Sequence, residues 1–302
     1  MKTLLTTVLF WLSVLAGWAQ QDPLYSQYQF NQLMINPAYT GVYDRFSIGL
    51  MSRLQWLGIE GAPVTHTLTA QKSILNGKAG IGGVILQDKF GVNTNTELQA
   101  TYSYNINFSA ARLAMGLQGG LINFNYDFSN LELDFIDDPS LNQGLDNFMR
   151  PNFGVGAMYI TDRYFVGASV PRILDINVND GSLKSTRYLR HYYLTGGFVF
   201  EPSPYTLIRV MSLMRYVVDG RISTELNVSS LIDEKIWGGI TVRDLRHFGI
   251  YMMLEATDNI RLGYSFEIPA NSLIQSNYGT HEISVFFRTK RRNDSILDQN
   301  YF

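Results

Sequence analysis

The feature that most constrains the fold is a two-residue alternation of apolar and polar side chains. Its longest uninterrupted example is residues 97–108, ELQATYSYNINF, in which every even-numbered residue is apolar or aromatic and every odd-numbered residue before Phe108 is polar. Successive side chains of a β-strand point to opposite faces, whereas a helix repeats every 3.6 residues and would mix the two classes. The segment therefore predicts a strand with one apolar and one polar face.

The same alternation predicts about fourteen strands between residues 45 and 289. They are expected near residues 45–56, 63–75, 79–90, 96–108, 111–126, 151–161, 163–171, 187–200, 205–217, 221–231, 235–243, 247–256, 259–268 and 281–289. The links at 76–78, 109–110, 161–163, 203–204, 232–235 and 257–259 are short. Between them fall longer links near 57–62, 88–95, 127–150, 172–186, 218–220, 243–247 and 269–280, of which 218–220 and 243–247 are too short to fit well.

This pattern predicts an all-β fold, a transmembrane outer-membrane β-barrel of about 14 antiparallel strands, because such barrels alternate short periplasmic turns with longer external loops. Lipid offers no partner for backbone N–H and C=O groups, so a spanning sheet must close on itself. A polar lumen also explains a mean hydropathy of only −0.04. A soluble exported β-protein that binds a glycan or an adhesive partner is the alternative, since alternation alone does not distinguish a lumen from solvent.

The N-terminus predicts export. Lys2 precedes an apolar run from Thr3 to Ala16, and Gly17-Trp18-Ala19 offers small residues at a cleavage site. The run is shorter than the ~20 residues of a spanning helix. We therefore expect residues 1–19 to be a signal peptide and residues 20–44 to be an N-terminal periplasmic or plug-like segment. The barrel is expected at 45–289 and a periplasmic tail at 290–302, in a chain integral to the cell outer membrane.

Composition argues against several classes of function. The formal net charge of −2 gives no basic excess for nucleic acid, and the absence of cysteine removes thiolate metal sites. The four histidines, His66, His191, His247 and His281, stand apart without a metal-ligand spacing. Ser284 follows His281 by three residues, which places the two on opposite faces of a strand. We therefore expect no enzyme, no metal and no cofactor.

Charged residues and glycines of the strands have structural interpretations. Arginine is expensive toward lipid, so Arg53, Arg112, Arg209 and Arg215 are expected to face the lumen and to pair with acids such as Glu97 and Glu225. The glycine-rich strands indicate close strand approach or strong curvature. The acidic residues of 127–150 fit no calcium-loop pattern and are expected in a solvated loop.

Two motifs before the first strand carry a family resemblance. QDPLYSQYQFN at 21–31 and INPAYTG at 35–41 resemble the opening of mature PorP/SprF proteins of the type IX secretion system. RLQW at 53–56, GAP at 61–63 with Thr65, the glycine-rich run 80–91, HYYLTGG at 191–197 and HEIS at 281–284 extend the resemblance from about residue 20 to 289.

The resemblance implies a non-enzymatic outer-membrane component, in Bacteroidota-type cells, for secretion or surface attachment of cargo with C-terminal sorting domains, and in some members for gliding. It implies a periplasmic secretion-ring lipoprotein and the cargo as partners. The alternative is an outer-membrane porin or uptake channel for small molecules. The candidate partner-binding segment holds the most distinctive match, in Asp22, Pro23, Tyr25, Tyr28, Phe30, Asn36, Pro37 and Tyr39.

Overall fold

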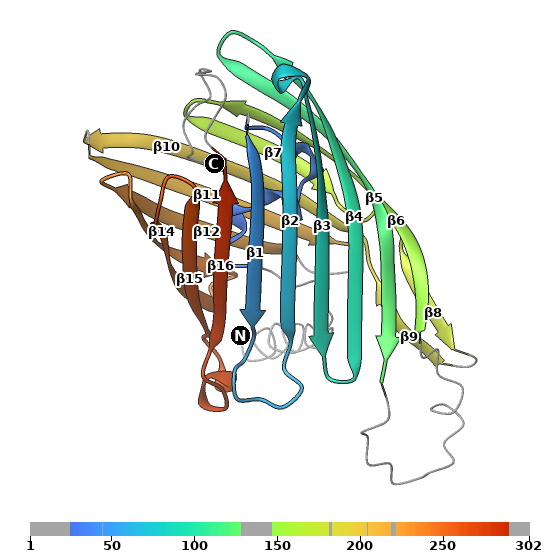
Figure 1. Ribbon diagram of the computed structural model, residues 1–302. Coiled ribbons are helices and arrows are strands. Elements are labelled where there is room, and N and C mark those ends of the chain that lie inside the picture. The colour runs from blue at the N-terminus through green and yellow to red at the C-terminus, as the bar shows by residue number, and fades with distance from the viewer. Residues whose placement is uncertain are drawn as a thin grey trace, which may run out of the picture.

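Fourteen antiparallel strands close into one barrel in the computed structural model, which describes residues 25–43, 45–127, 147–180, 183–203, 205–218 and 222–289 (Figure 1). The barrel strands are β1 (Phe46–Leu54), β2 (Val64–Ile74), β3 (Ala79–Phe90), β4 (Asn93–Asn107), β5 (Ala111–Tyr126), β6 (Asn147–Thr161), β7 (Tyr164–Val170), β10 (His191–Ser203), β11 (Thr206–Val217), β12 (Ile222–Ile232), β13 (Ile236–Arg243), β14 (His247–Glu255), β15 (Ile260–Pro269) and β16 (Thr280–Arg288). Neighbours in sequence are neighbours in the sheet, and β1 pairs with β16 to close it. The predicted fold class and strand number are confirmed.

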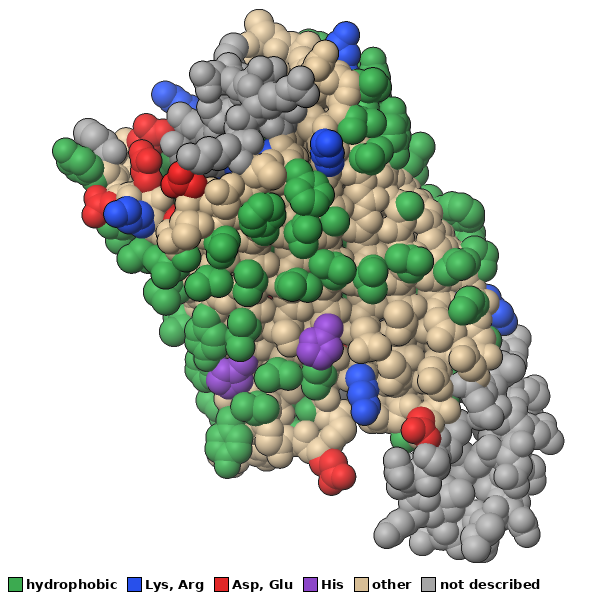
Figure 2. All heavy atoms as spheres, viewed as in Figure 1, with side chains coloured by type: hydrophobic (Ala, Val, Ile, Leu, Met, Phe, Trp, Pro, Cys, Tyr) green, Lys and Arg blue, Asp and Glu red, His purple; other side chains and the backbone are tan. Residues whose placement is uncertain are grey.

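The predicted faces are confirmed on β4, and β5 continues the same pattern. On β4, Leu98 is 58% exposed on the outer surface, whereas Glu97 is 4% exposed in the interior. Met115 and Leu117 of β5 are likewise exposed, and Gly116 between them is buried. Figure 2 shows hydrophobic side chains spread across the outer face of the strands. This is the distribution expected of a barrel with an apolar, lipid-facing exterior.

Exposed aromatic side chains gather toward both ends of the barrel wall. Near the short turns lie Tyr159, Tyr164, Phe200 and Tyr205, and near the longer links lie Tyr192, Tyr216, Phe248 and Tyr278. Tyrosine combines an apolar ring with a polar tip, which suits the two membrane–water interfaces. No helix in the described part of the chain is long and apolar enough to cross a membrane.

Two links differ from the sequence expectation. β3 and β4 continue to Phe90 and Asn93, so the expected loop near 88–95 is a two-residue turn in which Gly91 has φ +54°. Glycine adopts that backbone conformation without steric penalty. The link near 172–186 contains a hairpin of β8 (Ile176–Asp180) and β9 (Leu183–Tyr188), which forms a separate two-stranded sheet.

β7 has seven residues, far fewer than its neighbour β6, and the chain after it continues the wall without strand pairing. The Ile173 amide donates to the Phe153 carbonyl at 2.8 Å, and the Asn152 side-chain amide donates to the Leu174 carbonyl at 2.9 Å. The Ile173 amide and the Asn152 side chain therefore join the chain after β7 to the part of β6 beyond Val155, its last β7 partner.

Residues 25–43 lie inside the barrel as three short 3-10 helices (Figure 1, blue). These are η1 (Tyr28–Phe30), η2 (Gln32–Met34) and η3 (Pro37–Tyr39); η4 (Leu75–Gly77) and η5 (Ser272–Gln275) lie in links of the wall. Side chains of the segment share one apolar core with inward side chains of the wall, among them Tyr28, Leu33 and Ala38 with Met158, Phe165 and Trp237. The centre of the molecule is therefore packed by the chain's own N-terminal region.

Candidate functional site

The candidate site is the barrel lumen together with residues 25–43, which we call the lumen segment. Of these nineteen residues, all but Phe30, Met34 and Tyr43 are buried. Seven of the buried ones are serine, threonine, asparagine or glutamine: Ser26, Gln27, Gln29, Asn31, Gln32, Asn36 and Thr40. Buried polar groups are costly without partners, so each hydrogen bond that the wall supplies to them favours the docked segment.

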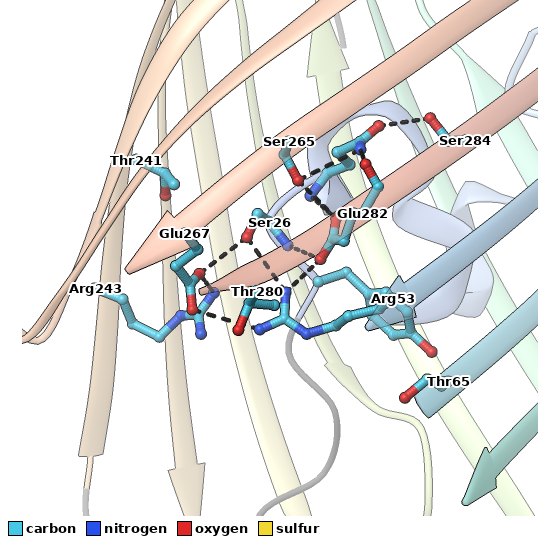
Figure 3. Close-up of polar contacts among 12 residues, drawn as sticks. Ser26, Arg53, Thr65, Thr241, Arg243, Ser265, Glu267, Thr280, Glu282 and Ser284 are labelled. Carbon is cyan, nitrogen blue, oxygen red and sulfur yellow. Dashed lines mark hydrogen bonds and ion pairs between the residues drawn. The ribbon is translucent and has the colours of Figure 1, made fainter. Parts of the chain in front are cut away.

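A buried acid of β16 holds the start of the lumen segment (Figure 3). Glu282 is 1% exposed, and its carboxylate accepts from the Ser26 amide at 2.7 Å and the Gln27 amide at 3.1 Å. The Ser26 hydroxyl donates to Glu267 of β15 at 2.9 Å, and the Ser284 hydroxyl donates to the Gln27 side chain at 2.5 Å. The last two strands of the barrel thus bind the first described residues of the chain.

Arginines balance these carboxylates. Arg53 of β1 pairs with Glu282 at 2.5 Å and with Glu267 at 3.4 Å. Arg243 of β13 pairs with Glu267 at 3.0 Å and with Glu225 of β12 at 2.7 Å. We call these five residues the charged latch. All five are buried, so the removal of one member would leave a neighbouring charge with fewer partners inside the barrel, which is destabilising.

An aromatic cluster holds the middle of the segment. The Phe30 ring packs edge-to-face on Trp237 and Tyr251, with centroid distances of 6.2 and 5.7 Å. The Arg209 guanidinium lies 4.9 Å from the Phe30 ring centre and 4.2 Å from that of Trp237. Arginine stacked on aromatic faces gains cation–π attraction, which is largest where water is excluded.

The INPAYTG motif forms the η3 turn. The Asn36 side chain accepts from the Ala38 amide at 2.9 Å, and Pro37 occupies the first helical position, where its missing N–H removes no helical hydrogen bond. Gly41 ends the motif with φ +61°. The turn is thus specified by its local sequence.

The η3 turn packs against a line of small residues that crosses five strands of the wall. Register pairs Gly80 of β3 with Ser103, Ser103 with Gly116, Gly116 with Gly156, and Gly156 with Ser169 of β7. A Cβ added at Gly80, Gly116 or Gly156 would overlap Thr40, Ala38 or Asn36, respectively. The hydroxyl of Ser169 donates to the Ile35 carbonyl at 2.6 Å. We call this line the small-residue row; it lets the turn lie directly on the strand backbone.

The structure places six of the eight candidate partner-binding residues in the lumen. Tyr25 hydrogen-bonds through its hydroxyl to Thr67 at 2.8 Å, and Tyr28, Asn36, Pro37 and Tyr39 are also buried, whereas Phe30 is half-buried. Burial raises the pKa of the Tyr25 hydroxyl above its ordinary value, so it stays protonated. Asp22 and Pro23 lie outside the described residues, as do residues 1–19, the tail 290–302 and most of the acidic loop.

The four strand arginines face the interior as expected, since Arg53, Arg112, Arg209 and Arg215 are all buried. Of the acids named as their partners, Glu97 pairs with Arg172 at 2.6 Å and Glu225 pairs with Arg243 at 2.7 Å. Sequence reasoning named Glu282 only within the HEIS match at 281–284 and did not single out Glu267 or Arg243. The signal was present, because each occupies an inward position of an alternating strand.

Ser284 and His281 do not form a catalytic pair in the described structure. Ser284 is bonded inside the lumen, while His281 bonds to the Tyr264 hydroxyl at 2.8 Å near the exposed surface, so the two do face apart. Within the described ranges, no three His, Asp or Glu side chains lie close enough together to hold a metal ion. The chemistry visible in the lumen is hydrogen bonding, ion pairing and apolar contact.

The model of one protein family, described as type IX secretion system membrane protein PorP/SprF, matches residues 18–287. No curated protein matches the sequence. Among solved structures, the CymD monoaromatic hydrocarbon channel is similar with a TM-score of 0.51 and 10% identity over 93% of this chain and 97% of that one.

The Ralstonia pickettii toluene transporter TbuX has a TM-score of 0.49 and 10% identity, covering 86% of this chain and 93% of its own. Omp33 of Acinetobacter baumannii has a TM-score of 0.47 and 8% identity, covering 82% and 99%. At these identities the similarity to CymD shows a shared barrel fold.

Proposed function

Because the chain belongs to the PorP/SprF family of type IX secretion system membrane proteins, we propose that it supports secretion or surface attachment of cargo with C-terminal sorting domains. The family match carries this proposal, because it includes both the lumen segment and the barrel. The protein is accordingly a component of that system with an outer-membrane barrel fold. We also propose that a cleaved signal peptide exports the chain and that the barrel is integral to the outer membrane. The proposed cargo includes gliding adhesins.

The proposed partners are a periplasmic secretion-ring lipoprotein and the cargo itself. We place the short-turn end of the barrel toward the periplasm, following the asymmetry of outer-membrane barrels. The lumen segment is the proposed partner-binding region. Since Tyr25, Tyr28 and Tyr39 are buried against the wall, a partner that binds those side chains must first draw the segment out of the lumen. In this proposal, partner binding and opening of the lumen are one event.

The deciding experiment replaces residues 22–41 with a Gly/Ser linker of equal length in a cell that lacks the native gene. We expect this variant to insert as a heat-modifiable barrel and to fail to secrete a reporter fused to a C-terminal sorting domain. The wild-type chain, expressed at the same level, is the control. Normal secretion by the inserted variant would exclude the lumen segment, and normal secretion without the gene would exclude the secretion role itself.

A porin or uptake channel is the second candidate, because the barrel is a closed wall around a partly polar interior. The packed lumen favours the secretion proposal, because a diffusion channel needs a path that its own side chains leave open. Single-channel recording on the purified full chain tests this. A steady open conductance would favour the porin, and a closed barrel that opens when residues 22–41 are replaced would favour a plug.

A further inference from the structure

The lumen contains a second charged group, separate from the charged latch and from the small-residue row. It surrounds a partly enclosed cavity of about 50 Å³ near the short-turn end. Arg45, Arg209, Arg261 and Arg288 line the cavity together with polar and aromatic residues, and its described lining contains no carboxylate. A cavity of this size admits a few water molecules or one small ion.

One acid outside the lining pairs with two of these arginines. Glu255 of β14 binds Arg261 at 2.6 Å through one carboxylate oxygen and Arg288 at 2.6 Å through the other. All three side chains are 11–12% exposed. Among the described residues, the cavity and its surroundings therefore contain four guanidinium groups and one carboxylate. This is an excess of positive charge.

This excess is unfavourable without an anion. Arg45 approaches from just before β1, where its guanidinium stacks on the Tyr43 ring at 5.1 Å. Burial and the neighbouring Arg261 lower the pKa of Arg45. Nη1 of Arg288 is buried and makes no hydrogen bond in the described structure. Buried guanidinium groups need both charge balance and acceptors, and bare cations held together repel one another.

We propose that this cavity is a binding site for one tetrahedral oxyanion, phosphate or sulfate, held by Arg45, Arg261 and Arg288. Guanidinium groups bind such oxygens through paired, charge-assisted hydrogen bonds. The anion accepts from the free Nη1 of Arg288, while Glu255 keeps Arg261 and Arg288 in place. The site does not depend on the proposed secretion role, because it rests only on the charge and geometry of the lumen.

The test is isothermal titration of the purified full-length protein in detergent with inorganic phosphate, at constant ionic strength against chloride, and with sulfate in parallel. We expect saturable binding of one anion per chain. Removal of one charge-assisted contact should weaken it by about tenfold or more in Arg45→Gln and in Arg288→Gln. Arg163→Gln is the matched control, because Arg163 lies exposed in a short turn at the same end.

If Arg288→Gln fails to fold, the test relies on Arg45→Gln. Arg45 precedes β1 and has no ion pair with Glu255 in the described contacts, so its replacement leaves the Glu255 pairs with Arg261 and Arg288 intact. Loss of binding in Arg45→Gln with retention in Arg163→Gln supports the site. Absence of saturable phosphate and sulfate binding by the wild type overturns it, as does equal binding by wild type and Arg45→Gln.

Discussion

At the scale of single residues, Glu282 combines near-complete burial with bonds to both backbone and side-chain groups. It accepts from two backbone amides of the lumen segment and pairs with Arg53. Glu282→Gln removes the negative charge that pairs with Arg53. It also replaces one of the two acceptor oxygens with an NH2 donor. We expect the free energy of unfolding to fall by about 3–5 kcal/mol, the usual cost of breaking a buried ion pair from one side. The measurement is the folded fraction at increasing urea concentrations, which is read from the heat-modifiable gel shift.

Glu60→Gln provides the matched control, because Glu60 is exposed in the link between β1 and β2. Surface substitutions of this kind change stability by about 0.5 kcal/mol or less. Equal urea midpoints for Glu282→Gln and Glu60→Gln would show that the latch contributes nothing measurable.

At the scale of elements, the η3 turn packs directly against the small-residue row of the wall. A Cβ at Gly116 would overlap the Ala38 backbone, whereas a Cβ at Gly238 on the outer face of β13 meets nothing within 4 Å. We expect Gly116→Ala to lift the turn off the wall while the strands stay paired, and Gly238→Ala to leave it in place. The chain has no cysteine, so Ala38→Cys supplies a single thiol as a reporter.

The measurement is the rate of maleimide labelling at residue 38 in membranes. It should rise at least tenfold with Gly116→Ala and stay unchanged with Gly238→Ala, because Ala38 has 0% exposure in the docked turn. Slow labelling in both variants would mean that the turn and wall adapt to the added methyl group.

At the scale of the whole molecule, the exterior must tolerate lipid around the full circumference. Ile250 of β14 is 60% exposed at mid-strand and pairs with Ile240. A lysine on the lipid face near the midplane costs about 2–4 kcal/mol. Ile250→Lys should therefore reduce the folded fraction in liposomes, whereas Leu245→Lys in the link before β14 should not. Equal folded fractions would contradict a lipid-facing outer surface.

The strands were predictable because their signal is local. Alternation in residues 97–108 is sufficient to separate Leu98 outside from Glu97 inside. The prediction of a loop near 88–95 was wrong because polar Asn93 and Asn95 look like loop residues. In the barrel both pair with β3, and Asn95 is 4% exposed on the inward face.

The lumen contacts were not predictable from local pattern. The pairing of Ser26 with Glu282 joins residues 256 positions apart, and it requires closure of the sheet before the two are neighbours. The small-residue row likewise depends on the register of five strands, which no single strand sequence reveals. Each glycine alone is compatible with a bulge, a bend or close packing.

The charged latch also sets an order of assembly. Its members on β12, β13, β15 and β16 are synthesised last, whereas Ser26 and Gln27 emerge among the first residues. The early segment therefore has no complete docking partner until the final hairpin forms, and such non-local contacts form slowly because the intervening chain must first be ordered. Docking of Ser26 thus reports completion of the sheet: a chain truncated before β15 retains its N-terminal motif but lacks the acids that would receive it.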